Sequence, residues 1–240
     1  MILEAKNVSK SFLGLQALKK LDVSINKGEI VGLIGPNGAG KTTLFNVIGG
    51  YLKPSTGEVI FDGHNITGQH PYTVARKGMA RTFQIVKPLT GLTVLENVMV
   101  GSFLEGTSTK HTQEKAGETL QQVGLYEKRN QTAGNLTLAG RKRLEVARAL
   151  AIKPKLILLD EVMAGLNATE VQQTIELIHL IREKGITIFI IEHIMHVIMS
   201  VSDRVIILNY GEKLCEGTPK EIINDKRVIE AYLGEGFDLA

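Results

Sequence analysis

Apolar runs alternate with turn residues over the first 66 residues of the chain. Asp22 to Ile25, the turn Asn26-Lys27-Gly28 and Ile30 to Ile34 predict a strand, a turn and a second strand, and Glu58 to Phe61 repeats the pattern. Between them, Lys41 to Tyr51 follows a glycine-rich turn and is expected to be a helix. This part of the chain therefore predicts strands with a helix among them.

The pattern changes between about residues 88 and 150. Val94 to Phe103, Glu118 to Val123 and Arg141 to Ala151 predict helices, and Glu105 to Gly117 is a polar segment among them. We expect a helical subdomain at about residues 88–151, inserted into a core formed by residues 1–87 and 152–240.

Strands return in the last third of the chain. Leu156 to Leu159 and Ile186 to Ile191 are short apolar runs, which are typical of buried parallel strands. The helix predicted between them, Thr169 to Lys184, carries one apolar stripe: Val171, Ile175, Ile178 and Ile181. This arrangement is a βαβ unit, so the expected fold class is α/β.

Two further elements are expected near the end. Arg204 to Leu208, Asn209-Tyr210-Gly211 and Glu212 to Cys215 predict a hairpin. Thr218-Pro219-Lys220-Glu221 predicts a helix that begins with a capping box and has proline at its first position.

The segment GPNGAGKTTL, which begins at Gly35, matches the pattern G-x-x-x-x-G-K-[ST] between an apolar strand and a predicted helix. Its glycines let the backbone turn N–H groups toward a phosphate, and the N-terminus of the helix adds a positive field. Lys41 can reach the β- and γ-phosphates, and the Thr42 hydroxyl can bind Mg²⁺. The expected nucleotide site consists of Gly35, Pro36, Asn37, Gly38, Ala39, Gly40, Lys41, Thr42 and Thr43.

A pair of carboxylates follows the apolar strand Leu156 to Leu159. The carboxyl ends of parallel strands are where ligands collect in α/β folds. Asp160 suits a Mg²⁺ ligand, and Glu161 could hold and polarise an attacking water molecule.

The order and spacing of these motifs closely resemble those of the ATP-binding subunit of ABC transporters over essentially the whole chain. The resemblance implies a P-loop ATPase cassette with an N-terminal antiparallel β region and an inserted helical subdomain, using ATP and Mg²⁺. By position, Phe12 matches the aromatic residue that stacks on adenine, with packing on the strand surface as the alternative. Gln84, in RTFQ, matches the glutamine that touches Mg²⁺ and the water, and His193, in IFIIEHIM, matches the histidine that contacts the γ-phosphate.

The family's signature turn normally reads leucine, serine, glycine, glycine, glutamine, and in these proteins it closes on the ATP held by a second subunit. Here the turn is Thr137, Leu138, Ala139 and Gly140, so a hydroxyl is kept while two glycines are replaced. The basic residues Arg141, Lys142 and Arg143 then open the predicted helix, where they either attract a phosphate or face solvent. We expect a working ATPase with an altered signature, and a subunit that no longer hydrolyses ATP is the alternative.

Two more positions depart from the family pattern. Val162 replaces the proline that usually follows the Asp-Glu pair. Asn167, in AGLN, replaces an aspartate and keeps its hydrogen-bonding shape without the charge.

Within the family, ARTFQIVKPLTGLTVLENVMVG and the ending NYGEKLCEGTPKEIINDKRVIEAYLGEGF look most like the branched-chain amino acid importer subunit. That resemblance implies a second ATPase subunit (identical or paralogous), separate membrane permeases and indirectly a solute-binding protein. We expect the permease contact at residues Val86 to Asn97, where a mobile surface loop is the other interpretation and is compatible with the first. The alternatives are the cytoplasmic ATPase of lipopolysaccharide export and a soluble ABC ATPase that has no permease. This chain does not determine which solute is carried, because the permeases and a binding protein select it.

Composition and charge limit the partners and the cellular location that we expect. The formal charge is +3, from 28 basic and 25 acidic residues, which argues against a nucleic-acid partner. No run of about 18 apolar residues is present, and the first residues lack the features of a secretion signal. We expect a cytoplasmic protein bound at the inner face of the cell membrane through its partners.

Overall fold

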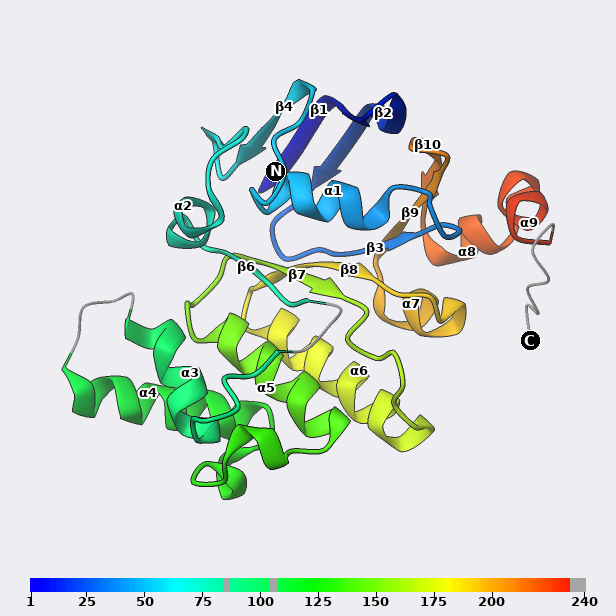
Figure 1. Cartoon of the computed structure of the whole chain (residues 1–240). Coiled ribbons are helices and arrows are strands. Elements are labelled where there is room, and N and C mark those ends of the chain that lie inside the picture. Colours follow the sequence, from blue (N-terminus) through cyan, green and yellow to red (C-terminus); the bar gives the residue numbers. More distant parts are fainter. Residues whose placement is uncertain (84–86, 104–107, 234–240) are drawn as a thin grey trace.

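The computed structural model of the chain describes residues 1–83, 87–103 and 108–233. Its strands form a four-stranded antiparallel sheet and a six-stranded sheet, with helix α1 (Lys41–Ile48) packed between them (Figure 1). The first sheet has the order β2 (Leu15–Ile25), β1 (Leu3–Phe12), β4 (Thr56–Phe61), β5 (His64–Asn65). The second has the order β10 (Glu212–Gly217), β9 (Arg204–Asn209), β3 (Ile30–Ile34), β8 (Thr187–Ile191), β7 (Leu156–Asp160), β6 (Met79–Arg81).

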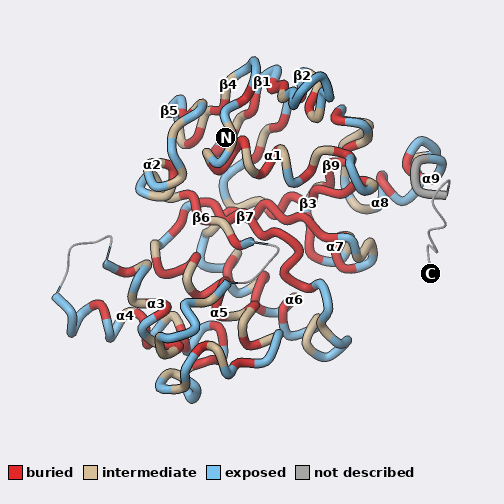
Figure 2. The backbone as a smooth tube through the Cα atoms, in the orientation of Figure 1, coloured by how far each residue is buried: buried red, intermediate tan, exposed pale blue. Residues whose placement is uncertain are grey.

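The six-stranded sheet is parallel from β9 to β6, and β10 pairs with β9 as an antiparallel edge strand. Its central strands β3, β7 and β8 are buried along their whole length (Figure 2). Successive side chains of a strand point to opposite faces, so each strand serves two cores. Ile157 and Ile188 pack on the helical side, whereas Leu158 and Phe189 pack on the side of α1 and the antiparallel sheet.

The remaining helices surround this sheet. They are α2 (Pro71–Arg76), α3 (Val94–Ser102), α4 (Thr109–Gln122), α5 (Leu138–Leu150), α6 (Ala168–Glu183), α7 (Met195–Val201), α8 (Pro219–Ile223) and α9 (Lys226–Leu233). In Figure 1, α2 lies beside the antiparallel sheet and α8 and α9 lie beside the C-terminal hairpin, whereas α3 to α6 lie on the other side of the six-stranded sheet. Helices α3, α4 and α5 pack on one another between residues 88 and 151. The exact limits of an inserted subdomain stay a prediction.

Several predicted elements are present as expected. The β9–β10 hairpin turns through Tyr210 and Gly211, both at positive φ (45° and 80°), as a two-residue hairpin loop requires. Helix α8 begins with the predicted capping box between Thr218 and Glu221. The strands β7 and β8 and the helix α6 form the predicted βαβ unit.

The predicted strands on either side of the turn at residues 26–28 are both present, β2 in the antiparallel sheet and β3 in the six-stranded sheet. Two expectations were wrong in detail. Helix α4 begins at Thr109, nine residues before the predicted start at Glu118, because Ser108 caps it and its buried positions Thr112, Ala116 and Leu120 are four residues apart. Helix α5 begins at Leu138, three residues before the predicted start.

Candidate nucleotide site

The phosphate loop leaves β3 at Gly35 and enters α1 at Gly40. A Cβ on Gly35 would lie 2.2 Å from the Leu208 carbonyl oxygen, so no other residue fits there without moving the backbone. Gly40 has a φ of 103°, and its Cβ would lie 2.7 Å from the Ala17 carbonyl oxygen. Both glycines are therefore required by close contacts as well as by the loop's own curvature.

The C-terminal hairpin braces this loop. The Gly211 N–H donates to the Ala39 carbonyl at 3.0 Å, and the Lys19 N–H of β2 donates to the Gly211 carbonyl at 2.9 Å. Segments from three parts of the chain thus fix the loop between the antiparallel sheet and the hairpin.

Lys41 and Thr42 lie where the loop becomes helix. The buried Lys41 ammonium donates to the Gly35 carbonyl at 2.5 Å and to the Pro36 carbonyl at 3.0 Å, so it points into the curve of the loop. Gly40 offers no side chain to cap α1, and the first N–H groups of the helix are donors for an anion. Thr42 is exposed, as are Asn37 and Gly38 at the tip of the loop, while Thr43 is half-buried.

Asp160 and Thr42 line one cavity of about 480 Å³. Asp160 ends β7 and is 1% exposed, and its Oδ2 accepts from Arg81 Nη2 at 2.9 Å. Burial raises the pKa of Asp160, and the Arg81 guanidinium opposes that rise. Among the described residues, the second oxygen, Oδ1, has no hydrogen-bond partner although it is buried.

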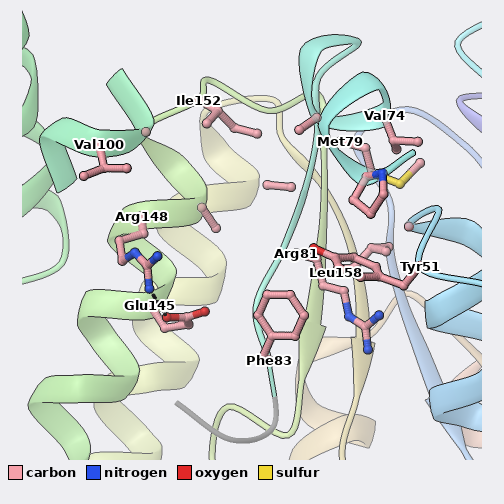
Figure 3. Close-up of a pocket in the computed structure, with 16 residues that line it drawn as sticks. Tyr51, Val74, Met79, Arg81, Phe83, Val100, Glu145, Arg148, Ile152 and Leu158 are labelled. Carbon is pink, nitrogen blue, oxygen red and sulfur yellow. Dashed lines mark hydrogen bonds and ion pairs between the residues drawn. The ribbon is translucent and has the colours of Figure 1, made fainter. Parts of the chain in front are cut away.

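Arg81 itself is an unexpected part of the site. Its Nη1 donates to Asn46 Oδ1 of α1 at 2.6 Å, and its guanidinium lies 5.4 Å from the ring centres of both Tyr51 and Phe83. Figure 3 shows these two rings beside Arg81 in a second cavity of about 210 Å³, which opens between α1, α2, β6 and the helices α3 and α5. The segment RTFQ contains this arginine, but the family resemblance implies a role only for Gln84 in it.

Glu161 and His193 are in direct contact, through Glu161 Oε1 and His193 Nε2. Glu161 is 8% exposed and has a φ of 50°, an unusual backbone conformation for a residue with a side chain. The structure thus brings Glu161 and His193 together beside Asp160, at the carboxyl ends of β7 and β8.

Two predicted residues are not placed in this cluster. Gln84 lies outside the described residues. Phe12 is at the end of β1 and is 40% exposed, with Lys10 Nζ 5.0 Å from its ring centre. Its role in stacking on adenine stays a prediction.

The predicted signature turn is a helix N-terminus. Thr137 is the N-cap of α5, and its hydroxyl accepts from the Gly140 N–H at 3.2 Å, so Leu138, Ala139 and Gly140 form the first turn. These residues do not line the cavity that holds Thr42 and Asp160. Leu138 instead lies against the loop after Glu161, with Cδ2 3.1 Å from the position a Cβ on Gly165 would take.

The basic residues that follow contact other parts of the same chain, and the solvent-facing interpretation is wrong for the buried Lys142. Arg141 donates to the Gly134 carbonyl at 2.8 Å, and Arg143 contacts Gln173 of α6. Lys142 is 7% exposed and donates to the main-chain carbonyl of Glu161 at 2.7 Å. Sequence reasoning missed this buried amine because the helix start was placed three residues too late.

Asn167 has a clear structural task. It is the N-cap of α6: its Oδ1 accepts from the Glu170 N–H at 3.0 Å, and Glu170 Oε2 accepts from the Asn167 N–H at 3.0 Å. Asparagine serves an N-cap as well as the aspartate usual in the family.

Comparison with known proteins agrees with this geometry. Residues 18–164 match the family described as ABC transporter. The chain belongs to the ABC transporter family. Residues 212–238 of the cassette also match the family described as branched-chain amino acid ATP-binding cassette transporter. The cassette is 38% identical to the high-affinity branched-chain amino acid transport ATP-binding protein BraF of Pseudomonas aeruginosa, over 98% of each chain.

Solved structures give the same result for the fold. The cassette is similar to the crystal structure of a nucleotide-free ATP-binding cassette from an ABC transporter, with a TM-score of 0.89, 34% identity, and coverage of 98% of this chain and 99% of that one. It is also similar to a dimeric post-hydrolysis cassette bound to ADP and Pi, with a TM-score of 0.83, 28% identity, and coverage of 91% and 99%. The predicted family, fold class and ATPase activity are confirmed.

Proposed function

We propose that the cassette hydrolyses ATP to drive the import of branched-chain amino acids through separate permease subunits. The observation that carries this proposal is the similarity to BraF along 98% of both chains, joined to the match at residues 212–238. The nucleotide site described above supplies the chemistry that such a subunit needs.

Each side chain of the cluster has a proposed part in hydrolysis. The phosphate loop and Lys41 bind the phosphates, since the Lys41 ammonium lies on the inside of the loop and the backbone N–H groups of a glycine-rich loop of this kind bind anions. Glu161 holds the attacking water as general base, and His193 contacts the γ-phosphate while fixing the Glu161 side chain by their mutual hydrogen bond. Gln84 is proposed to join them from outside the described residues.

The residues present also fit Mg²⁺. Thr42 and Asp160 line the same cavity, and Asp160 Oδ1 lacks a hydrogen-bond partner among the described residues. Hydroxyl and carboxylate oxygens are hard donors of the kind that Mg²⁺ prefers. The described residues hold no group of three or more His, Cys, Asp or Glu side chains that could bind a metal on their own, so phosphate oxygens would complete the shell. When bound, the ion neutralises charge on the phosphates.

The signature helix suits a site in a second subunit. The N-terminus of α5, capped by Thr137, lies away from the cavity of its own chain and carries the positive end of a helix dipole. The first-turn residues Leu138 and Ala139 are at least partly exposed, so they are available to a partner cassette. We propose that an identical or paralogous cassette places its ATP there.

Permease docking is proposed for the cavity between α2 and α3. Large apolar side chains are exposed at its rim, including Tyr51, Phe83 and Val100 (Figure 3). The neighbouring loop has a fixed shape, because buried Asn97 bonds the Leu89 N–H at 2.9 Å and the Leu89 carbonyl at 3.0 Å. No described helix is long and apolar enough to cross a membrane. From the similarity to transport ATP-binding proteins such as BraF, we propose a peripheral position on the cytoplasmic face, with a solute-binding protein acting through the permeases.

Uptake of labelled leucine tests the proposal in cells that lack other leucine importers. Cells express the transporter with the natural cassette, with Glu161→Gln, or with Glu183→Gln as a matched control at an exposed position on α6. Removing a general base typically lowers turnover about 100- to 10,000-fold, so uptake should fall to background with Glu161→Gln. The control variant should transport at the natural rate.

Unchanged uptake with Glu161→Gln at equal expression would refute the proposal. An absence of leucine uptake from every version, with ATP hydrolysis intact in the natural one, would retain the ATPase and reject the amino acid cargo. Export of a membrane lipid would then be the activity to assay.

A further inference from the structure

The buried ammonium of Lys142 has no part in the hydrolysis proposed above. It belongs to the second turn of α5 and is 7% exposed. Burial lowers the pKa of Lys142, while the nearby charges of Glu192 and Glu161 oppose that change. A charged group removed from water is costly unless it gains partners, so its position between α5 and β7 requires a reason.

The partner of Lys142 is a strained part of the backbone. Glu161 has a φ of 50°, and this backbone conformation is unfavourable for a non-glycine residue unless its surroundings hold it there. Its N–H donates to the Ile191 carbonyl at 2.9 Å, its carbonyl accepts from Lys142 Nζ at 2.7 Å, and its side chain contacts His193. The Lys142 bond is the one of these three that comes from α5.

Glu192 holds the same segment of backbone at a second point, Met163. It is 1% exposed, and its Oε1 accepts from the Met163 N–H at 2.8 Å. Its carboxylate lies close enough to Lys142 for their charges to interact. Lys142 and Glu192 thus hold the segment that contains the proposed general base, Glu161 through its carbonyl and Met163 through its N–H.

Helix α5 connects this segment with the signature. Lys142 follows Thr137 by five residues, which is about 7.5 Å along the helix axis. A helix of this length moves as a rigid unit, so a shift of its N-terminus is transmitted to the Lys142 side chain.

We propose that Lys142 is a positioning residue that ties the backbone of Glu161 to the signature helix, so that engagement of the partner's nucleotide at α5 sets the geometry of the general base in the same chain. This inference rests on the proposed function. It assigns to Lys142 a route by which one ATP site of a cassette pair senses the other.

The test compares kcat and KM for ATP in the assembled transporter carrying Lys142→Met, Lys142→Arg or the control Arg143→Met. Arg143 is the next residue on α5 but faces Gln173 of α6. Misplacement of a catalytic group by about 1 Å costs up to about 100-fold, so Lys142→Met should lower kcat about 10- to 100-fold and change KM less than about threefold. Lys142→Arg should recover most of kcat, and Arg143→Met should match the natural chain.

The double variant Lys142→Met with Glu161→Gln decides whether Lys142 acts through Glu161. If it does, the double variant turns over no more slowly than Glu161→Gln alone, because the group being positioned is already gone. The inference would be overturned if kcat of the double variant fell below that of Glu161→Gln by the same factor that Lys142→Met causes in the natural chain. It would also be overturned if Lys142→Met alone left kcat unchanged or altered only KM. Should Lys142→Met fail to fold, Lys142→Gln replaces it, and an unchanged kcat there would equally overturn the inference.

Failure of the proposed function gives a different result. In that case Glu161→Gln itself leaves hydrolysis or leucine uptake unchanged, whatever the Lys142 variants do.

Discussion

Replacing Arg81 by methionine should lower the free energy of unfolding by about 3–5 kcal/mol, the usual loss when one member of a buried ion pair is removed. The Arg81 side chain is 6% exposed and that of Asp160 1%, with 2.9 Å between Nη2 and Oδ2. The variant also loses the 2.6 Å hydrogen bond to Asn46. Methionine keeps much of the packing against the neighbouring rings, so most of the loss comes from the uncompensated carboxylate.

The pH dependence of that loss follows from the pKa of Asp160. Burial raises this pKa and Arg81 opposes the rise, so the pKa rises further in the variant. A carboxyl group whose folded-state pKa is raised loses its stabilising contribution as pH increases through that value. The loss caused by Arg81→Met should therefore be greater at about pH 8 than at about pH 5.

Urea unfolding of the natural chain, Arg81→Met, Asp160→Asn and the double variant measures both effects. The double variant should be more stable than the sum of the single losses predicts, with a coupling of at least about 2 kcal/mol. A loss below about 1 kcal/mol for Arg81→Met, or additive losses in the double variant, would refute the reasoning.

Three further predictions concern Glu192, Asn167 and Thr137. Burial raises the pKa of Glu192 from 4.5 to about 7, so its stabilising contribution is full below pH 4.5 and lost as pH rises through 7. The free energy of unfolding measured with urea should therefore decrease as pH rises, and Glu192→Gln should remove up to about 3 kcal/mol of that decrease. An equal decrease in Glu192→Gln and the natural chain would contradict the raised pKa of Glu192. Asn167→Ala should lose about 1 kcal/mol of unfolding free energy and Asn167→Asp only a few tenths, whereas equal losses would exclude the N-cap role. Thr137→Ala should cost about 1 kcal/mol in the same assay, with Thr137→Ser restoring it, and failure of serine to do so would count against the capping bond.

The central strands were predictable because their surroundings are uniform. Every residue of β7 and β8 is buried, so an uninterrupted apolar run identifies them directly. The capping boxes and the phosphate loop were equally clear, since each depends on residues close together in sequence. What the sequence shows well is local chemistry and burial on both faces of a strand.

Helix α5 shows where this reasoning ends. Its buried residues include Gly140, Lys142 and Glu145 besides its apolar ones, because it packs between the sheet and α3 and α4 and is covered on most sides. An amphipathic pattern therefore gave the wrong start and the wrong exposure for Lys142. The partner that makes a buried lysine tolerable, the Glu161 carbonyl, lies 19 residues away and is fixed only by the tertiary fold. The same holds for Arg81, whose partner Asp160 is 79 residues away.

Because the phosphate loop is braced, it loses its conformational entropy when the chain folds and not when nucleotide binds. The bonds from Gly211 to Ala39 and from Lys19 to Gly211 hold the loop in its curved form as part of the core. Its loss of conformational entropy thus does not weaken the binding of nucleotide. Under the proposed function, this loop needs no rearrangement to bind nucleotide, and the proposed pairing of two cassettes is then the step at which transport can be timed.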